Sequence, residues 1–428
     1  MTTIRGLVGV GCLLLGIGAS VPALARDMGR ETLAPGDGWA AYGTGTTGGA
    51  AADADHVFTV TNRQELLAAL ANRSTTPKII YVAGTIDVNV DDAGQPLTCE
   101  DYARDGYTLE GYLEAPSGPM EAARVASQAA QQGRVRIRIG SNTTIVGQDK
   151  EARIRGAWFD IRGSANVKVS NIIVRNLRFE DTFDCFPQWD PTDGSQGNWN
   201  ALYDSISLRD ATNVWIDHNT FADRETADEN APSYFGRLYQ RHDGQLDITN
   251  ASDLVTVSWN RFLSHDKVML IGSSDSAAAD RGKLRVTIHH NLFQDVNQRA
   301  PRVRFGQVHV YNNLYKIERA WRYGGSWTVG IESAIVAENN FFRIDDAVAP
   351  DTIITVSKGT AIQESGTLLD GPADKNLFDL VAAYNAVRDP DLGTDVGWVP
   401  TLVLELERTR KVLPSVQGHS GPIDPFDD

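Results

Sequence analysis

The chain has 428 residues, of which 42% are hydrophobic and 22% are charged, and its formal net charge is −15 at pH 7. These proportions are typical of a soluble globular protein. The acidic balance argues against nucleic acid as a partner, because affinity for it comes largely from Lys and Arg at phosphates. A polyanionic ligand would need basic residues gathered locally, or a metal ion between like charges.

The first 25 residues have the pattern of a secretory signal peptide. Arg5 supplies a positive start, Leu7–Ile17 an apolar core, and Ala23–Ala25 a small-residue cleavage site. The apolar core is too short to span a bilayer, and no later run of about 18 apolar residues follows it. We expect an extracellular or periplasmic protein that begins near Arg26 and has no membrane partner after cleavage.

A short helix is predicted close to the start of the mature chain. Asn62 can cap the segment "RQELLAALAN", with Glu65 at the third helical position. We expect this helix to cover the open end of the repeats described below. Two insertions that contain Gly and Pro, 91–132 and 184–199, are expected to form long loops over a groove.

Two of the three cysteines remain in the mature chain, because Cys12 lies in the signal peptide. In a secreted protein, Cys99 and Cys185 are candidates for a disulfide, which would contribute roughly 4–5 kcal/mol in the chain-entropy model. The alternative is a pair of buried free thiols.

One pattern recurs through the middle of the chain: an alternating strand that ends in Asn, then one residue, then an aromatic residue. The segments are "VWIDHNTF", "VTVSWNRF", "VTIHHNLF", "VHVYNNLY" and "AIVAENNFF", and "NIIVRNLRF" (171–179) is a looser copy. Their asparagines are Asn219, Asn260, Asn291, Asn313 and Asn340. A repeat of about 22 residues with variable insertions is typical of a solenoid. The Val, Ile and Thr content at period 2 indicates β-strands.

The economical fold is a right-handed parallel β-helix in the all-β class, because hairpin turns every 8–12 residues are missing. Asn after each strand suits a sharp turn in the left-handed region. Asn stacked on Asn would form an amide ladder, and the aromatic residues could stack inside. A second strand precedes each copy, so we predict two strands per coil. We expect one domain over 26–428, with a repeat core of about 57–342, a segment after Pro350 packed on the outside, and a monomer.

Charged residues recur at one place in the repeat frame. Asp204 lies 15 residues before its asparagine, Asp243 and Asp247 lie 17 and 13 before theirs, and Arg299 lies 14 before its own. Lys267 begins the first strand of its coil. Because coils of a β-helix stack about 4.7–4.9 Å apart, we expect these five side chains to form one patch.

Three clustered carboxylates would repel one another strongly unless a cation lies between them. Aspartates without a thiol or a dominant His are hard-cation ligands, and an extracellular location favours Ca²⁺. The alternative for each Asp is a turn cap or a solvated side chain. Pro301 makes a straight strand improbable at 299–304, so a bend could bring Arg299 and Arg304 to the same groove and leave Arg302 to pair elsewhere.

These motifs closely resemble those of the pectate lyases of polysaccharide lyase family one. The resemblance is carried by "WIDHNTF", "DGQLDITNASDLVTVSWNRF", "SHDKVMLIGSSD", "QRAPRVRFGQVHVYNNLY" and "FEDTFDCFPQWDPTDG", from about Val57 to about Asn340. It implies a parallel β-helix and Ca²⁺-dependent cleavage of polygalacturonate by β-elimination, which leaves a 4,5-unsaturated sugar.

The resemblance also assigns roles to six residues. The calcium carboxylates fall on Asp204, Asp243 and Asp247, the catalytic arginine on Arg299, and the substrate-binding basic residues on Lys267 and Arg304. Arg normally stays protonated, so an Arg base predicts an alkaline optimum. The competing functions are a pectin lyase on methylated substrate, a polygalacturonase with a carboxylate pair, and a non-catalytic polygalacturonate-binding solenoid.

Overall fold

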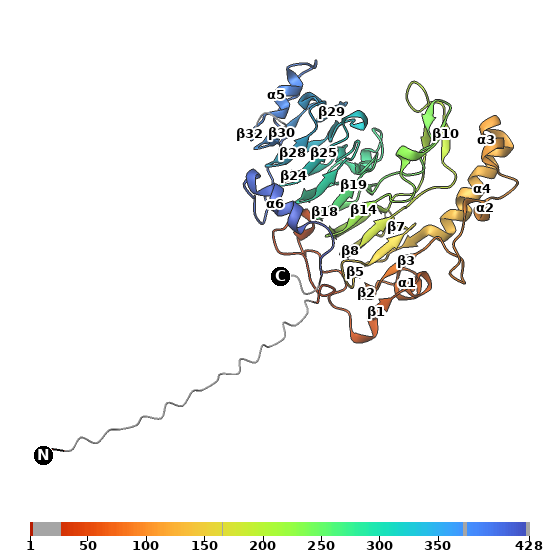
Figure 1. Ribbon diagram of the computed structural model, residues 1–428, viewed down its shortest axis with the longest axis horizontal. Coiled ribbons are helices and arrows are strands. Elements are labelled where there is room, and N and C mark those ends of the chain that lie inside the picture. The colour runs from red at the N-terminus through yellow and green to blue at the C-terminus, as the bar shows by residue number, and fades with distance from the viewer. Residues whose placement is uncertain (3–26, 165, 371–374, 425–428) are drawn as a thin grey trace.

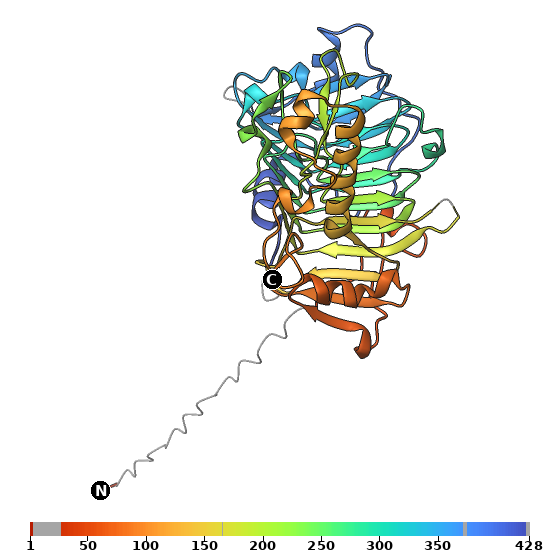
Figure 2. The same cartoon turned by 90° about the vertical axis from the view of Figure 1, so that its right-hand side faces the viewer.

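The structure is a computed structural model that describes residues 1–2, 27–164, 166–370 and 375–424. From residue 3 on, the signal peptide predicted over 1–25 lies outside the described residues. The chain winds into a right-handed parallel β-helix, whose stacked coils are seen side-on in Figure 2. The fold class predicted from the repeats is therefore confirmed.

Three sheets run the length of the β-helix (Figure 1). Sheet 1 contains β1 (Val57–Val60), β2 (Lys78–Val82), β5 (Thr143–Gly147), β8 (Val169–Arg175), β13 (Ala211–Asp217), β18 (Asp253–Ser258), β21 (Val286–His289), β24 (Gln307–Tyr311), β27 (Ala334–Glu338) and β30 (Ile362–Ser365). Sheet 2 contains β4 (Arg136–Arg138), β7 (Trp158–Arg162), β12 (Ile206–Arg209), β17 (Leu246–Thr249), β20 (Leu270–Ile271), β23 (Arg302–Val303), β26 (Trp327–Gly330) and β29 (Ile354–Ser357). Sheet 3 contains β3 (Thr85–Asp87), β6 (Arg153–Arg155), β9 (Arg178–Glu180), β14 (Thr220–Ala222), β19 (Arg261–Leu263), β22 (Leu292–Gln294), β25 (Leu314–Ile317), β28 (Phe341–Ile344), β31 (Leu368–Asp370) and the antiparallel β32 (Lys375–Leu377).

Each central coil has three strands, where the sequence predicts two. The additional strand is the short segment immediately after the repeat Asn, such as β14 after Asn219 and β19 after Asn260. Three residues are too few to show the period-2 alternation that marks a strand in a sequence. The aromatic residue of the repeat lies in this third strand and points into the core.

The amide ladder predicted from the repeat is present. Each Nδ2 donates to the Oδ1 of the next asparagine at 3.0–3.1 Å, in the order Asn219, Asn260, Asn291, Asn313 and Asn340. Each Oδ1 also accepts from the backbone N–H of the preceding asparagine. At the N-terminal end Leu177 takes the equivalent position, and its N–H donates to Asn219 Oδ1. The ladder therefore satisfies buried backbone groups on successive coils.

The left-handed turn residue is not the ladder asparagine. Positive φ values belong to the residue before it: His218 (51°), Trp259 (55°), His290 (53°), Asn312 (51°) and Asn339 (50°). The sequence prediction that the repeat Asn adopts the left-handed region is wrong. The position before it turns the chain, and the ladder Asn, which turns inward, is kept for its amide.

The repeat aromatics form a stack inside the solenoid. Ring centroids lie 4.3–5.1 Å apart, with planes tilted by 3–11°, along Phe179, Phe221, Phe262, Phe293, Tyr315 and Phe342. Valine and isoleucine side chains from all three sheets fill the rest of this core. Stacked rings and branched side chains bury a large apolar area, which is the main source of stability.

The predicted helix near the N-terminus is α1 (Arg63–Leu70), and Asn62 caps it by accepting from Glu65 N at 3.0 Å. It lies beside the first strands of the stack (Figure 1). Leu66 and Leu70 are fully buried in the main core. The segment before it, 27–56, runs along sheet 1, where Trp39 N and Ala40 N donate to threonine hydroxyls.

The two insertions predicted to be loops have regular structure. The first contains α2 (Cys99–Tyr102), α3 (Leu109–Glu114) and α4 (Gly118–Val135), and α4 (orange in Figure 2) runs along the coils. The second forms a hairpin of β10 (Gln188–Asp190) and β11 (Asn198–Asn200). A smaller hairpin, β15 (Ser233–Tyr234) with β16 (Arg237–Leu238), lies near it. Together they enclose a separate aromatic core of Tyr102, Tyr107, Tyr112, Phe186, Trp199 and Tyr239.

The coil continues beyond Pro350, where the sequence analysis ends the repeat. Strands β29, β30 and β31 pair in parallel with the preceding coil, so the solenoid reaches Asp370. This coil has no repeat Asn and aromatic pair, which hides it in the sequence. The chain then forms α5 (Leu380–Asn385) and returns along the outside to α6 (Thr409–His419), as expected for the last segment.

Candidate functional site

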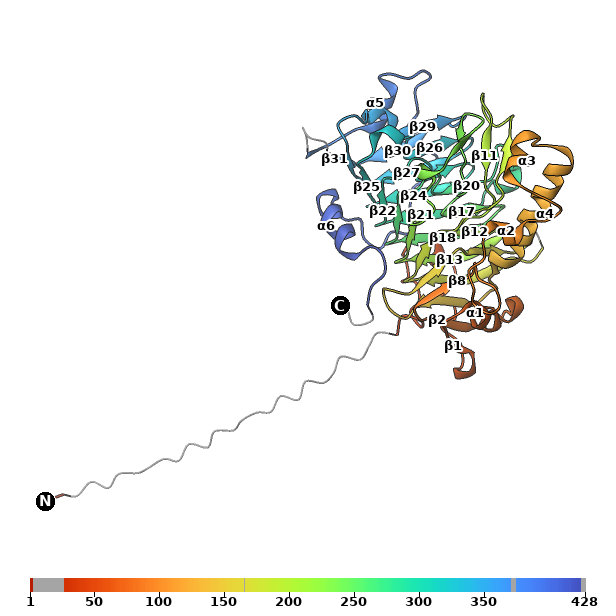
Figure 3. The ribbon, with the colours of Figure 1, turned by 45° about the vertical axis from the view of Figure 1, so that its right-hand side comes forward.

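Asp247 lies in β17 of sheet 2, and the other residues selected from the sequence lie in the segments just before or after strands of this sheet. Strand pairing places Ser207 beside Asp160 on one side and beside Asp247 on the other. Leu270 lies next to Asp247 and pairs with Arg302 on the next coil. The apolar residues between them, such as Ile248 and Val303, point into the core. Figure 3 shows this sheet beside α2, α4 and β11.

Asp204 and Asp247 face one another across Gly244. A Cβ on Gly244 would lie 2.4 Å from Asp247 Oδ1 and 3.0 Å from Asp204 Oδ1, so only glycine leaves this space free. Gly244 N donates to Asp204 Oδ1 at 2.8 Å, and Leu270 N donates to Asp247 Oδ1 at 3.0 Å. Ser207 Oγ donates to Asp204 Oδ2 and accepts from Trp158 Nε1. Both carboxylates are thereby fixed, with their oxygens converging.

This arrangement disfavours two negative charges. Burial, followed by repulsion from Asp247 and Asp243, raises the pKa of Asp204 well above its usual range. Burial and Asp243 likewise raise the pKa of Asp247 to about 7. Buried carboxylates with converging oxygens and no compensating charge between them have the character of a hard-cation site.

Asp243 contributes to this field but is also engaged by a lysine. Lys267 Nζ lies 3.3 Å from Asp243 Oδ1. Over the described ranges, no three Asp, Glu, His or Cys side chains are arranged as a complete set of metal ligands. Asp204 and Asp247 therefore fit a cation in the space that Gly244 leaves free between them, which we call the cation cradle. Asp243 pairs instead with Lys267.

A buried histidine holds the backbone at Asp243. His265 Nε2 lies 2.7 Å from the carbonyl oxygen of Asp243, and His265 Nδ1 lies 2.5 Å from Asp223 Oδ2. Burial lowers the pKa of His265, but Asp223 and these hydrogen bonds outweigh it and raise the pKa to about 9. A protonated His265 donates to both partners, and so fixes the position of Asp243.

Arg299 lies just before β23, two coils beyond the strand that carries Asp247. Its backbone has φ of 60°, an unfavourable conformation for a residue other than glycine, and its Nε atom is buried without a hydrogen-bond partner among the described residues. The Arg299 charge acts to lower the pKa of Asp247. A strained backbone and an unpaired buried donor mark Arg299 as a functional candidate.

Arg302 in β23 and Arg304 just after it both point outward, since Val303 between them is in the core. Arg304 is held by Asp275 Oδ1 at 2.7 Å and by the carbonyl oxygen of Gly272 at 2.9 Å. Burial, then repulsion from Arg304 and Arg299, lowers the pKa of Arg302 to about 10. Arg302 Nη2 donates to Ser357 Oγ at 3.3 Å, so Arg302 has a partner away from Arg299 and Arg304.

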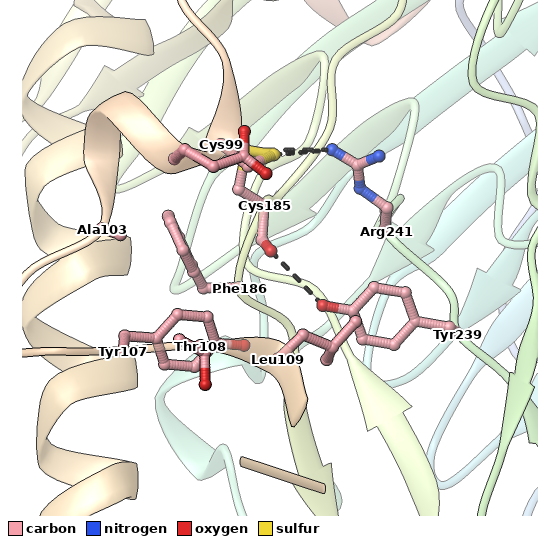
Figure 4. Close-up of a pocket in the computed structure, with 10 residues that line it drawn as sticks. Cys99, Ala103, Tyr107, Thr108, Leu109, Cys185, Phe186, Tyr239 and Arg241 are labelled. Carbon is pink, nitrogen blue, oxygen red and sulfur yellow. Dashed lines mark hydrogen bonds between the residues drawn. A yellow bond between two sulfur atoms is a disulfide. The ribbon is translucent and has the colours of Figure 1, made fainter. Parts of the chain in front are cut away.

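Cys99 and Cys185 form a disulfide, the first of the two alternatives drawn from the sequence. Arg241, two residues before Asp243, donates to Cys99 Sγ at 3.1 Å, and Tyr239 donates to the carbonyl oxygen of Cys185 at 3.3 Å (Figure 4). These residues line a cavity of about 320 Å³ between the helical insertion and the coil. The disulfide thus links the helical insertion to the 184–199 insertion, and Arg241 and Tyr239 connect this pair to the loop that carries Asp243.

Several contributing residues escaped the sequence analysis. Gly244 makes the cradle, Ser207 fixes Asp204, and Asp275 orients Arg304. Gly244 had one signal, its place between the two aspartates of "DGQLD". Ser207 and Asp275 have none, because counting residues locates a coil but not the direction of a side chain.

Comparison with known proteins gives consistent matches. A family model described as "Pectate lyase" matches residues 12–113 and 115–374. A pectate lyase of Bacillus subtilis is 45% identical over 93% of this chain and 94% of its own length. A pectate lyase E of Dickeya dadantii is 36% identical over 81% of this chain and 78% of its own length.

Solved structures match over nearly the whole chain. The thermostable pectate lyase PL 47 superposes with a TM-score of 0.89 at 46% identity, over 93% of this chain and all of that one. A pectate lyase bound to a hexasaccharide has a TM-score of 0.86 at 44% identity, over 92% of this chain and 98% of that one. With its parallel β-helix and the charged cluster on sheet 2, the chain belongs to the pectate lyase family of polysaccharide lyases.

Proposed function

We propose that the protein is a secreted, Ca²⁺-dependent pectate lyase that cleaves α-1,4-linked polygalacturonate by β-elimination. The observation that carries this proposal is the convergence of Asp204 and Asp247 on the Gly244 cradle, with Lys267 and Arg299 beside them. The relatives named pectate lyase and the hexasaccharide-bound structure support it. The products would be oligogalacturonides with a 4,5-unsaturated end.

Asp204, Asp243 and Asp247 would hold the calcium ion, whose oxygen-rich coordination suits carboxylates. When bound, Ca²⁺ would neutralise the substrate carboxylate and stabilise the enolate-like charge that forms as the C5 proton leaves. For Asp243 to join the other two, its ion pair with Lys267 must open, which frees the Lys267 ammonium for the substrate.

The basic residues would then divide the remaining work. Lys267 and Arg304 donate to the substrate carboxylate, and Asp275 keeps the Arg304 guanidinium in place. Arg299 accepts the C5 proton, and solvent water protonates the leaving oxygen. Because an arginine must first lose its own proton, the reaction runs faster at alkaline pH.

The proposed base is Arg299. Arg299→Ala is expected to reduce elimination on polygalacturonate by about 10³-fold or more, since a positioned base contributes about 10²–10⁴-fold. Arg302→Ala, a neighbour in the same cluster, is expected to reduce it far less. The measurement is the ultraviolet absorbance of the unsaturated product, with circular dichroism to check folding.

If Arg302→Ala lost far more of the elimination rate than Arg299→Ala, the base would be Arg302. A rate maximum near pH 5 would contradict an arginine base altogether.

Calcium is tested separately by titration calorimetry without substrate, where Asp247→Asn should weaken Ca²⁺ binding. A chelator should abolish activity, and activity on methylated pectin that survives the chelator would favour a pectin lyase.

We also propose that the protein is secreted, that its signal peptide is cleaved near Arg26, and that it is a monomer. The described residues include no helix that could cross a membrane. Mass spectrometry of protein recovered from culture medium would test the cleavage site, and light scattering would test the oligomeric state.

A further inference from the structure

The outer face of sheet 2 carries a second charged feature, on the N-terminal side of the candidate site. Arg73, Arg136, Arg138, Asp160 and Arg162 line a cavity of about 220 Å³. We call this set the arginine cavity. Four guanidinium groups and one carboxylate leave a surplus of three positive charges in a protein whose formal net charge is −15.

The single carboxylate is already satisfied inside the protein. Asp160 is 1% exposed and accepts from Arg136 Nε at 2.7 Å and from Arg162 Nε at 3.3 Å. Arg73 Nη2 donates to the carbonyl oxygen of Arg162 at 2.6 Å and makes no ion pair with a described residue. The ion pairs with Asp160 thus account for the positions of Arg136 and Arg162, but not for those of Arg73 and Arg138.

Arg138 is the arginine of this cavity with the fewest contacts to account for its position. It is exposed, and none of its five N–H donors makes a hydrogen bond or ion pair within the described part of the chain. Repulsion within the cluster is also evident: burial, with Arg209 and Arg136 opposing the attraction of Asp160, lowers the pKa of Arg162. Clustered guanidinium groups of this kind cost free energy unless an anion joins them.

Strand register fixes the cavity relative to the cation cradle. Asp160 pairs with Ser207, which pairs with Asp247, so the two aspartates lie two coils apart on the same outward column. With coils about 4.8 Å apart, that separation is roughly 10 Å. Arg302 lies two coils from Asp247 in the other direction. Sheet 2 therefore presents positive charge, paired carboxylates and positive charge again along one line.

A tryptophan connects the two regions. The Arg136 and Arg209 guanidinium groups lie 5.0 and 5.7 Å from the Trp158 ring centroid. Trp158 Nε1 donates to Ser207 Oγ, which holds Asp204. The face between the arginine cavity and the cation cradle is thus continuous along the sheet, with no loop inserted between paired strands β7 and β12.

We propose that the arginine cavity binds the carboxylate of a uronate unit in the same substrate chain, one or more sugars away from the bond that is cleaved. Arg138 and Arg73 supply the N–H donors, in the bidentate geometry that guanidinium groups offer to carboxylates. This inference rests on the proposed function, since it names a further part of the same substrate. Its consequence is a preference for longer uronate chains.

The test compares substrate length in matched variants. Arg138→Gln removes one exposed charge without disturbing Asp160. Arg410→Gln makes the same change on α6, which packs against sheet 3, and serves as the control. Initial rates are measured on trigalacturonate and hexagalacturonate. We expect Arg138→Gln to raise the hexamer KM about three- to tenfold, with the trimer KM and both kcat values unchanged within twofold.

The inference would be overturned if Arg138→Gln had the same ratio of hexamer KM to trimer KM as wild type. It would also be overturned if Arg410→Gln raised the hexamer KM by as much as Arg138→Gln does. Thermal unfolding of each variant excludes misfolding as the cause.

A binding measurement separates this inference from the proposed function. Calorimetry with hexagalacturonate in the presence of a chelator reports the arginine cavity without turnover. If wild type binds more tightly than Arg138→Gln but cleaves no polygalacturonate, the proposed function fails and the cavity stands. If cleavage is normal and both bind equally, the cavity assignment fails alone.

Discussion

Asp217 illustrates how a single buried charge is held in this protein. It lies at the end of β13 in sheet 1, with Arg175 Nη2 at 2.9 Å, His218 Nδ1 at 2.7 Å and Ser258 Oγ at 2.7 Å. Burial by itself raises the pKa of Asp217, but His218 and Arg175 outweigh it and hold the pKa at about 2. The ionised carboxylate is therefore part of the folded state.

Asp217 predicts a pH dependence of stability. A carboxyl whose pKa is lower in the folded than in the unfolded state stabilises the fold above the unfolded value of 3.8, by about 2 kcal/mol here, and loses this as pH falls through 2. Asp217→Asn should therefore unfold more easily in urea at pH 5–7. The difference from wild type should shrink between pH 4 and 2, and a constant difference would contradict the assignment.

At the residue scale, the sequence could place the site but not its geometry. Counting back from the repeat asparagines puts Asp204, Asp243 and Asp247 on neighbouring coils, because coil spacing is regular. Which oxygens converge depends on Gly244, and which lysine pairs with Asp243 depends on side-chain conformations. Those choices are made by packing and electrostatics in three dimensions.

At the scale of elements, the amide ladder is the main specific link between coils. Asn260 accepts from Asn219 N and Nδ2, and donates to Asn291 Oδ1 and to two backbone carbonyl groups. The asparagine is fully buried, so its loss leaves several backbone groups without partners.

Asn260→Ala should lower the free energy of unfolding by about 2–4 kcal/mol, because each unsatisfied buried group costs about 1–3 kcal/mol. Asn230→Ala, at the exposed end of a short 3-10 helix (Asp228–Asn230), is the control and should change it by less than about 0.5 kcal/mol. Chemical denaturation measures both. Equal stability of the two variants would mean that ordered water replaces the amide.

The repeat strands and the stacked aromatics were predictable because both follow a period in the sequence. The third strand of each coil was not, since β14 and similar strands are only three residues long. The residue at positive φ was misassigned for a related reason. Asn is favoured both in the left-handed region and in ladders, and only the structure separates His218 from Asn219 in these roles.

For the whole molecule, the returning C-terminal segment ties distant coils together. Val412 and Val416 of α6 are fully buried against Leu292, Leu314, Phe341 and Leu368, which come from four coils of sheet 3. Further along, Gly421 N donates to the carbonyl oxygen of Trp259, and Ile423 N donates to Asn176 Oδ1. The segment therefore covers an apolar row that the solenoid alone would expose.

Val412→Asp should detach this segment and lower the melting temperature by several degrees, because burial of one such side chain contributes about 1.5–3 kcal/mol and a charge cannot replace it. Gln417→Asp introduces the same charge at an exposed position of α6 and should leave the melting temperature unchanged. Differential scanning calorimetry measures both, and similar values would show that the coils do not depend on the segment.

The solenoid, two of its three sheets and one helix could be inferred from periodicity and capping. The helical insertion could not, because 91–132 carries the Gly and Pro content of a loop, and its packing depends on the aromatic core and the disulfide. The last coil was also missed, since β30 and β31 lack the repeat Asn and aromatic pair. Tertiary packing, rather than local pattern, determines both.

The uniform direction of the asparagine ladder has an evolutionary consequence. Every ladder asparagine donates its Nδ2 to the Oδ1 of the next asparagine toward the C-terminus. Each coil therefore offers an amide donor to the following coil and an amide acceptor to the preceding one. Gain or loss of one complete turn would preserve all connections, whereas one extra residue within a link would break them. The solenoid can therefore lengthen or shorten only in increments of about 4.8 Å, the spacing of its coils.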